Sequence, residues 1–283
     1  MTGEAQGLRL AVKRVAGMVP RLATTFDYAR FRFSHRQRWP PEHSSVLREI
    51  REHGYVMVPG YFDADQCNRC IADFERLIVD EPGHVQRASD VRVFGIEDLS
   101  PIIRRFADDP YLLALARAYN GTATVNAFTL ANRVDAVRGS RGSGEGWHKD
   151  SSFRQFKAFV YLNDVNADNG PFQLIHASHA LSDYLHDMRI GGLSFRHLRI
   201  SDDQVNRIVG DTNRLKTLTG ARGTLLLVDT AAIHRGCPPI RGTRYALTNY
   251  YVEPKQITRE FVDAYKPVLP DKVWGLRRMQ EGR

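Results

Sequence analysis

The first half of the chain mixes helical and extended hydrophobic patterns. The segment 44–53 has a helical pattern, and the β-branched and aromatic run 54–60 predicts a strand that ends in a turn at Pro59 and Gly60. After it comes a predicted helix that Asp63 or Asp65 can cap, with an apolar face of Cys67, Cys70, Ile71, Phe74, Leu77 and Ile78. A further helix is expected over 109–119, followed by strands over 122–134.

The second half is built from short extended segments. Apolar and β-branched runs at 156–162, 172–175, 223–228 and 243–252 are separated by turn signals, which predicts antiparallel β structure. A polar, glycine-rich loop at 136–146 is interpreted as an access loop. An insertion at about 179–218 contains helix-like pieces and several arginines. Long insertions in compact domains are often lids or binding loops. We therefore predict one mainly β domain with flanking helices over 41–283.

Charge is distributed unevenly along the 283 residues. The net charge is +8, and residues 1–40 hold eight basic and two acidic side chains, so this N-terminal extension carries +6. Apolar residues at three- and four-residue steps over 8–22 predict a short basic amphipathic helix. Two interpretations stay open: a helix docked on the body with a solvated basic face, which is commoner, and peripheral contact with an anionic membrane.

The sequence gives little support for a signal peptide, a membrane span or nucleic-acid binding. Lys13 and Arg14 interrupt what would be the apolar core of a signal peptide, and no apolar run reaches the length of a membrane span. No motif that reads nucleic acid is evident, so we expect no nucleic-acid partner. With 42% hydrophobic and 25% charged residues, the composition is ordinary and excludes a disordered or fibrous chain.

The chain has three cysteines, Cys67, Cys70 and Cys237. Their small, odd number does not suit a disulfide scaffold and favours a reducing compartment, so the cytoplasm is the expected location. The spacing of Cys67 and Cys70 suggests zinc or redox chemistry, but no second cysteine pair completes a zinc site and no thioredoxin-like pattern precedes it. Two small apolar core positions explain the pair better.

The most informative residues for chemistry are His148-x-Asp150 and His234. His148 and Asp150 fall at a predicted loop-to-strand boundary, where residues two apart share a face, and His234 follows the apolar strand 223–229. Two imidazoles and one carboxylate on one face of an ion form the facial triad of non-haem Fe(II) oxygenases, with open positions for a co-substrate and O2. Singly, these residues are better explained as core histidines and a turn cap; jointly, they favour the metal site.

The surrounding segments strengthen this interpretation. They are Gly54-Tyr55-Val56-Met57-Val58-Pro59-Gly60, Asn169-Gly170-Pro171-Phe172-Gln173 leading to Ala177-Ser178-His179, Gly223-Thr224-Leu225-Leu226-Leu227-Val228-Asp229 before His234, and Arg244-Tyr245-Ala246-Leu247. In order and spacing, the chain from about 54 to 253 resembles the phytanoyl-CoA dioxygenase family of Fe(II)- and 2-oxoglutarate-dependent oxygenases. The resemblance implies an antiparallel double-stranded β-helix, the cupin-like jelly roll.

The resemblance also implies roles for individual residues. His148, Asp150 and His234 would bind Fe(II), and Arg244 would pair with the distal carboxylate of 2-oxoglutarate, which its planar guanidinium suits. Asn132 and Phe159 resemble positions that contact or line the co-substrate. Arg241 competes with Arg244 for the carboxylate, but the placement of Arg244 just before an alternating strand matches the family better.

The chain departs from the family pattern after the second histidine. Many members follow this histidine with Gly-Ser, whereas here His234 is followed by Arg235, Gly236 and Cys237. If that serine normally hydrogen-bonds the co-substrate, another donor is needed in this chain.

The implied activity is hydroxylation of an unactivated C–H bond in a small-molecule substrate, with 2-oxoglutarate converted to succinate and carbon dioxide. Desaturation, ring closure and epimerisation use the same ligands, whereas halogenating members lack the carboxylate that Asp150 provides. Arg138, Arg141, Arg196 and Arg199 favour an anionic or carrier-linked substrate, although a solvated face explains any one of them as well. The alternative is a catalytically silent jelly-roll binding or scaffold protein, against which the intact site residues count.

Overall fold

The computed structural model describes residues 39–254 apart from 122, 152–153 and 195–196, together with the single positions 257, 262, 270, 273 and 275. The chain divides into two units, Met1–Pro40 and Pro41–Arg283, and the fold described below belongs to the second. The basic helix predicted at 8–22 lies outside the described residues, so it stays a prediction.

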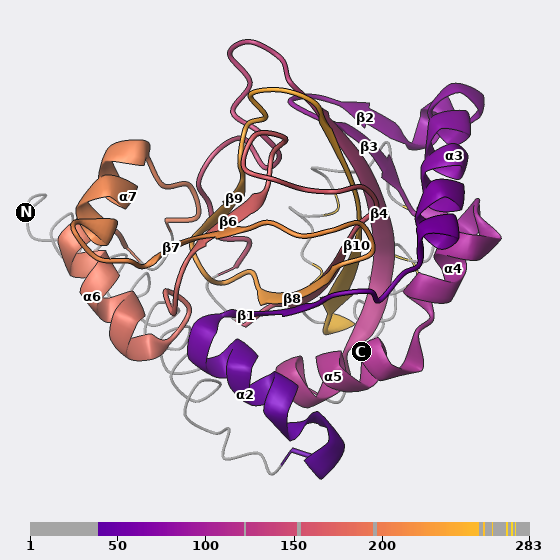
Figure 1. Ribbon diagram of the computed structural model, residues 1–283. Helices are drawn as coiled ribbons and strands as arrows, with labels where there is room; N and C mark the ends of the chain where they lie inside the picture. The colour runs from indigo at the N-terminus through magenta and orange to yellow at the C-terminus, as the bar shows by residue number, and fades with distance from the viewer. Residues whose placement is uncertain are drawn as a thin grey trace, which may run out of the picture. The chain divides into compact units, whose positions relative to one another are not determined.

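Seven strands form the larger of two antiparallel sheets, in the order β1-β8-β5-β10-β4-β3-β2 (Figure 1). They are β1 (Tyr55–Val58), β2 (Val85–Arg87), β3 (Val91–Phe94), β4 (Val125–Asp135), β5 (Phe156–Tyr161), β8 (Leu225–Asp229) and β10 (Thr243–Val252). The central strand β10 places Ala246 opposite both Asn132 of β4 and Tyr161 of β5. Because side chains alternate between the faces of a strand, Ala246, Asn132 and Tyr161 point to one face of the sheet, and so do the residues two positions away from each of them.

Three strands form the smaller sheet, in the order β7-β6-β9. They are β7 (Leu215–Leu218), β6 (Phe172–Ile175) and β9 (His234–Gly236). Phe172, Leu174 and Leu218 of this sheet share one buried cluster with Tyr161 and Leu226 of the larger sheet. The inner faces of the two sheets thus pack on each other, and the predicted jelly roll with flanking helices is confirmed.

Four helices pack against the larger sheet (Figure 1). They are α2 (Ser44–His53), α3 (Ala64–Asp80), α4 (Pro101–Ala107) and α5 (Pro110–Asn120), with single 3-10 turns at η1 (Pro41–His43), η2 (Pro82–His84) and η3 (Ile96–Asp98). Of the two expected caps of α3, Asp63 is the one used: it accepts from the Gln66 amide at 2.7 Å, and the Gln66 side chain accepts from the Asp63 amide at 3.0 Å. Asp109 caps α5 in the same position.

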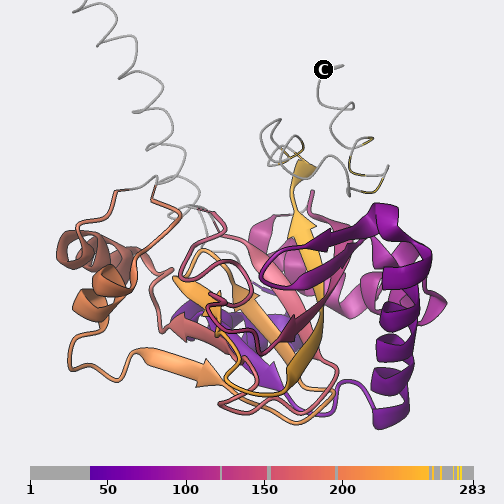
Figure 2. The same cartoon turned by 90° about the horizontal axis from the view of Figure 1, so that it is seen from above.

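The insertion at 179–218 folds as two helices, α6 (Leu181–Gly191) and α7 (Asp202–Val209), followed by β7. Both views place α6 and α7 at the opposite end of the fold from α3 (Figure 1 and Figure 2). Ile200, Val205 and Ile208 from this insertion pack with Trp147 and Ile233, the neighbours of the two histidines singled out above. The insertion therefore supports the predicted site from one side.

Several short elements were not predicted from the sequence. The hairpin of β2 and β3 contains strands of three and four residues, too short for their alternation to stand out. Helix α4 is also short, with seven residues. No helix within the described part of the chain is long and apolar enough to cross a membrane.

All three cysteines are unpaired thiols, and Cys67 and Cys70 lie on the buried face of α3 with no exposed surface. Burial raises the pKa of Cys67 to about 11 and that of Cys70 to about 12, so both stay protonated at neutral pH. The prediction that this pair fills core positions is consistent with their burial.

A thiol-labelling experiment tests this assignment. In the folded protein, a maleimide is expected to modify Cys237, which is partly exposed, and to leave Cys67 and Cys70 untouched because they are buried and protonated. Peptide mass spectrometry identifies the modified residues, and all three should react after unfolding. A Cys237→Ala variant that is still labelled rapidly in the folded state would contradict the assignment.

Candidate active site

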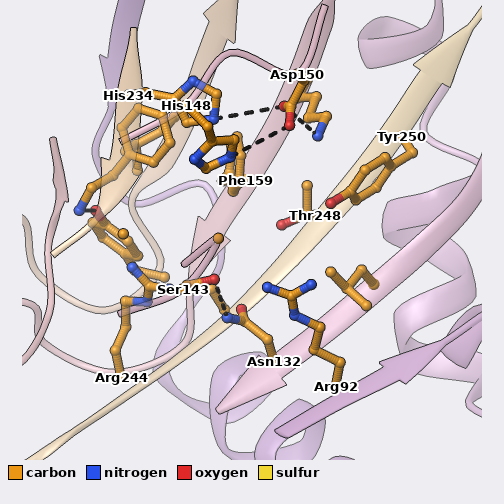
Figure 3. Close-up of a pocket in the computed structure, with 18 of the residues that line it drawn as sticks. Arg92, Asn132, Ser143, His148, Asp150, Phe159, His234, Arg244, Thr248 and Tyr250 are labelled. Carbon is orange, nitrogen blue, oxygen red and sulfur yellow. Dashed lines mark hydrogen bonds and ion pairs between the residues drawn. The ribbon is translucent and has the colours of Figure 1, made fainter. Parts of the chain in front are cut away.

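A cavity of about 130 Å³ lies between the inner faces of the two sheets. Strands β3, β4, β5, β8 and β10 of the larger sheet, β6 and β9 of the smaller sheet and the loop before Asp150 line it. All six residues predicted for the site line this cavity: His148, Asp150, His234, Arg244, Asn132 and Phe159 (Figure 3). The fold thus brings together side chains that are far apart in the sequence.

His148, Asp150 and His234 converge on one point of the cavity. Their ligand atoms all lie within 4.8 Å of one another. Oδ1 of Asp150 is 3.5 Å from Nε2 of His148, and Oδ2 is 3.6 Å from Nε2 of His234 (Figure 3). Two imidazole nitrogens and a carboxylate arranged in this way are the donor set of a facial-triad Fe(II) site, so the residues fit this metal.

Hydrogen bonds orient both imidazoles toward that point. Nδ1 of His148 lies 2.9 Å from the carbonyl oxygen of Gly146, and Nδ1 of His234 lies 2.9 Å from that of Ala232. Because a carbonyl oxygen only accepts, each Nδ1 carries the proton that it donates. Nε2 of each ring therefore faces Asp150 and can serve as the ligand atom.

Backbone pairing, rather than strand alternation, brings the two histidines together. The amide of His148 donates to the carbonyl of His234 and the amide of His234 donates to that of His148, both at 2.9 Å. Residues 147–150 form no continuous strand: His148 makes isolated bridges to His234 and Arg199, and the Asp150 amide donates to the Thr230 carbonyl at 3.0 Å. The predicted strand geometry at His148 and Asp150 was therefore wrong in detail.

The glycine-rich loop packs directly on His148. A Cβ atom at Gly144 would lie 2.2 Å from Cε1 of His148, and the φ angle of Gly144 is +84°, which favours glycine. Arg199 donates to the carbonyl of Gly144 and fastens the loop to the segment after α6. The loop interpreted as an access loop thus forms part of the cavity wall.

Asp150 is ionised and tightly held. Nζ of Lys157, which is only 3% exposed, lies 2.7 Å from Oδ2 of Asp150 and 3.7 Å from the centre of the Tyr250 ring. Burial alone would raise the pKa of Asp150, but the ion pair with Lys157 holds it well below its usual value. Lys157 was not predicted from the sequence, although a lysine inside the apolar strand 156–161 is an available signal.

His234 is buried against an aromatic ring. Its imidazole stacks on Phe172 with 5.2 Å between ring centres and an interplanar angle of 19°. Burial and the neighbouring His148 lower the pKa of His234 to about 3. The ring is therefore neutral at physiological pH, which is the form that binds metals.

Arg244 is the buried cation that the co-substrate prediction requires. It is 5% exposed, and Nη1 donates to the carbonyl of Gly170 at 2.6 Å. Among the described residues its Nε has no hydrogen-bond partner, and burial lowers the pKa of Arg244 below its usual value. Such a group fits a carboxylate ligand. Arg241, the competing candidate, is 80% exposed and pairs with Asp168.

Ser143 offers a hydroxyl where the chain departs from the family pattern. A Cβ atom at Gly236, two residues after His234, would lie 2.7 Å from the Ser143 side chain. Ser143 lines the cavity and its Oγ lies 3.4 Å from Nδ2 of Asn132. Its side chain thus occupies the space that a serine at position 236 would fill. No sequence signal predicted this placement of Ser143, because the residue lies in a glycine-rich loop.

Only part of the arginine set expected to favour an anionic substrate reaches the cavity. Arg199 lines it, whereas Arg138 and Arg141 are not among its lining residues. Arg196 lies outside the described residues. Arg92 of β3 lines the cavity and was not predicted.

Comparisons with known proteins agree with this geometry. The phytanoyl-CoA dioxygenase family model matches residues 50–238. The ectoine dioxygenase of Bordetella bronchiseptica is 23% identical over 212 residues, which cover 66% of this chain and 68% of the relative.

Two solved structures show the same fold. The epimerase SnoN of nogalamycin biosynthesis, in complex with Fe3+, alpha ketoglutarate and nogalamycin RO, has a TM-score of 0.59 at 19% identity, covering 76% of this chain and 85% of that chain. EctD from S. alaskensis with bound Fe has a TM-score of 0.58 at 18% identity, covering 78% and 81% of the two chains.

A jelly roll whose cavity holds two histidines and a carboxylate defines a non-haem iron oxygenase. With a family match that spans most of its length, the chain belongs to the phytanoyl-CoA dioxygenase family. The fold and the class of enzyme predicted from the sequence, an Fe(II)- and 2-oxoglutarate-dependent dioxygenase, are confirmed.

Replacing Lys157 by methionine tests the electrostatics of the site. The change leaves the Asp150 carboxylate without its cation, and breaking such a pair costs about 3 kcal/mol of unfolding free energy in the metal-free protein. Added Mn(II), an O2-stable stand-in for Fe(II), should recover part of this loss because the metal replaces the missing charge. Denaturant unfolding with and without Mn(II) measures both effects. Lys216→Met on β7 is the control, and a loss that Mn(II) leaves unchanged would contradict the assignment.

Proposed function

We propose that the enzyme hydroxylates an unactivated C–H bond of a small, anionic or carrier-linked metabolite, with Fe(II) held by His148, Asp150 and His234. Arg244 anchors the distal carboxylate of 2-oxoglutarate. The observation that carries the proposal is the presence, in one cavity, of three converging metal-ligand side chains and a buried arginine whose Nε has no partner among the described residues.

The protein groups have separate tasks in this reaction. Bound Fe(II) and 2-oxoglutarate supply the oxidising power from O2, with succinate and carbon dioxide as by-products. His148 and His234 offer neutral Nε2 atoms, and Lys157 holds one oxygen of Asp150 and so orients the carboxylate. Arg244 fixes the far end of the co-substrate.

Other groups shape the co-substrate space. Asn132 and Ser143 place an amide and a hydroxyl on the wall, and Phe159 adds an aromatic ring to it. If the serine after the distal histidine hydrogen-bonds the co-substrate in other members, we assign this hydrogen bond to Ser143 in this chain. The role of Asn132 and Phe159 in lining the co-substrate follows the resemblance to the family.

A small-molecule substrate agrees with the names of the relatives, an ectoine dioxygenase and an epimerase of nogalamycin biosynthesis. The carboxylate of Asp150 argues against halogenation, because halogenating members lack this ligand. Ring closure, desaturation and epimerisation use the same protein ligands, and hydroxylation is proposed as the default outcome. The three unpaired thiols suit the cytoplasm, where we place the reaction. Contact of residues 8–22 with a membrane surface stays a separate prediction.

An anaerobic titration tests the proposed function. Metal-free protein is titrated with Fe(II) and then 2-oxoglutarate, and the visible charge-transfer absorption of the chelate is recorded. The band is expected in the parent and should be lost in His234→Ala. Arg244→Met should raise the 2-oxoglutarate concentration at half-saturation by about tenfold to a hundredfold, the value of a charge-assisted hydrogen-bonded pair.

The neighbouring arginine provides the matched control. Arg241→Met removes an exposed guanidinium that pairs with Asp168 and should titrate like the parent. Arg244→Met removes a buried cation rather than creating one, so it should fold. A parent protein without the visible band, or equal effects of the two arginine changes, would refute the proposed site.

A further inference from the structure

Asp229 is a buried carboxylate directly before the turn that leads to His234. It is the last residue of β8, is 1% exposed and ends the apolar run 223–229. Its amide donates to the carbonyl of Gly54 at 2.9 Å, next to the pairing of β8 with β1. Asp229 is not among the residues that line the cavity, so any effect on the metal site must pass through the groups that it holds.

Neutral donors from three segments hydrogen-bond this carboxylate. Oδ1 accepts from the amide of Ala231 at 2.9 Å and from the amide of Gln155 at 3.0 Å. Oδ2 accepts from the hydroxyl of Tyr119, on α5, at 2.8 Å. Because a buried carboxylate destabilises the fold unless hydrogen bonds compensate it, these donors fix the position of Asp229, and Asp229 fixes theirs.

The turn that Asp229 holds contacts two of the predicted ligands. The carbonyl of Thr230 accepts from the Asp150 amide at 3.0 Å, and the carbonyl of Ala232 lies 2.9 Å from Nδ1 of His234. The Ala232 amide donates in turn to the carbonyl of Asp229 at 3.1 Å. A shift of this turn would therefore move Asp150 and His234 together.

The same carboxylate also fixes the start of β5. While the amide of Gln155 donates to Asp229, its carbonyl accepts from the amide of Thr230 at 2.9 Å. Two residues further on, Lys157 forms its ion pair with Asp150. Asp229 is thus a common anchor for the segment before His234 and for the segment before Lys157.

We propose that Asp229 is a positioning residue of the metal centre. Its carboxylate holds the turn 229–233 so that Nε2 of His234 and the carboxylate of Asp150 lie in position to bind Fe(II). Groups that hydrogen-bond behind metal ligands contribute about tenfold to a hundredfold in metal affinity, because they fix the orientation of the ligands. The inference rests on the ligand set of the proposed function and extends it to the residue that orients two of the ligands.

Mn(II) binding to the metal-free protein tests this role. The electron paramagnetic resonance signal of free Mn(II) is recorded during a titration and gives the dissociation constant. Asp229→Ala should raise this constant about tenfold to a hundredfold. Asp229→Asn keeps an oxygen acceptor of the same shape for the amides of Ala231 and Gln155, so it should recover most of the affinity.

A second measurement needs no metal. Long-range proton–nitrogen NMR spectra of the metal-free protein show which imidazole nitrogen of His234 carries the proton. The parent and Asp229→Asn should carry it on Nδ1, where the carbonyl of Ala232 accepts it. Asp229→Ala should show both tautomers, because the turn no longer holds that carbonyl in place.

Two variants separate positioning from a general loss of stability. Tyr119→Phe removes the hydrogen bond to Oδ2 and leaves those from the turn to Oδ1, and Leu77→Ala opens a cavity on the buried face of α3. Both should lower the free energy of unfolding, measured with denaturant, and bind Mn(II) like the parent. Asp229→Ser retains a weaker acceptor for the Ala231 amide; it takes the place of Asp229→Ala if that variant does not fold, with a smaller loss of affinity expected.

The outcomes distinguish this inference from the proposed function. Parental Mn(II) affinity in the Asp229→Ala or Asp229→Ser protein, a loss no larger than that of Leu77→Ala, or an Asp229→Asn protein no better than Asp229→Ala would overturn the inference alone. An unchanged His234 tautomer in Asp229→Ala would also overturn it. A parent that does not bind Mn(II), or a His234→Ala variant that binds it like the parent, would refute the proposed ligand set, and the inference with it.

Discussion

The reciprocal backbone pairing of His148 with His234 is the interaction on which the site depends. Two hydrogen bonds of 2.9 Å join segments that are far apart in the sequence and set the imidazole centres 4.3 Å apart. The Asp150 amide is fastened to Thr230 in the same region, so the third ligand arrives with the first two. The conformational entropy that must be lost to bring the three ligands together is therefore lost on folding, and packing of the two sheets offsets this cost. A metal ion then binds to a preformed site.

Buried charge is the second constraint on the cavity, because ions removed from water destabilise the fold unless other charges or hydrogen bonds compensate them. Asp150 is compensated by Lys157, and Asp90 by Arg92. Arg244 donates to a neutral carbonyl, and its lowered pKa reflects the cost of its burial. Proteins retain such groups at functional sites, where a ligand completes the compensation. In the proposed function, the distal carboxylate of the co-substrate provides this compensation for Arg244.

The centre and the rim of the cavity have different roles. His234 and Arg244 lie on strands of the jelly roll, and backbone hydrogen bonds join His148 and Asp150 to it. This chain shares the fold with the epimerase SnoN and with EctD from S. alaskensis. Arg92 lies on β3 of the short β2–β3 hairpin, and Arg199 lies in the insertion between α6 and α7. Binding residues are often carried by such connecting segments on a rigid scaffold, so we expect selection among substrates to lie there.

The sequence by itself determined the elements whose signals are local: the helix at 44–53 and the strand at 243–252 appear with the predicted bounds, and one of the two expected caps, Asp63, is used. Motif order also determined the six site residues that share the cavity. Only the tertiary structure decided that Lys157 forms an ion pair with Asp150. The same holds for Ser143, which fills the space beside Gly236, and for Arg92, which lines the cavity. The reason is physical: caps and periodicity act between near neighbours, whereas these contacts depend on strand register and loop packing between residues distant in the chain.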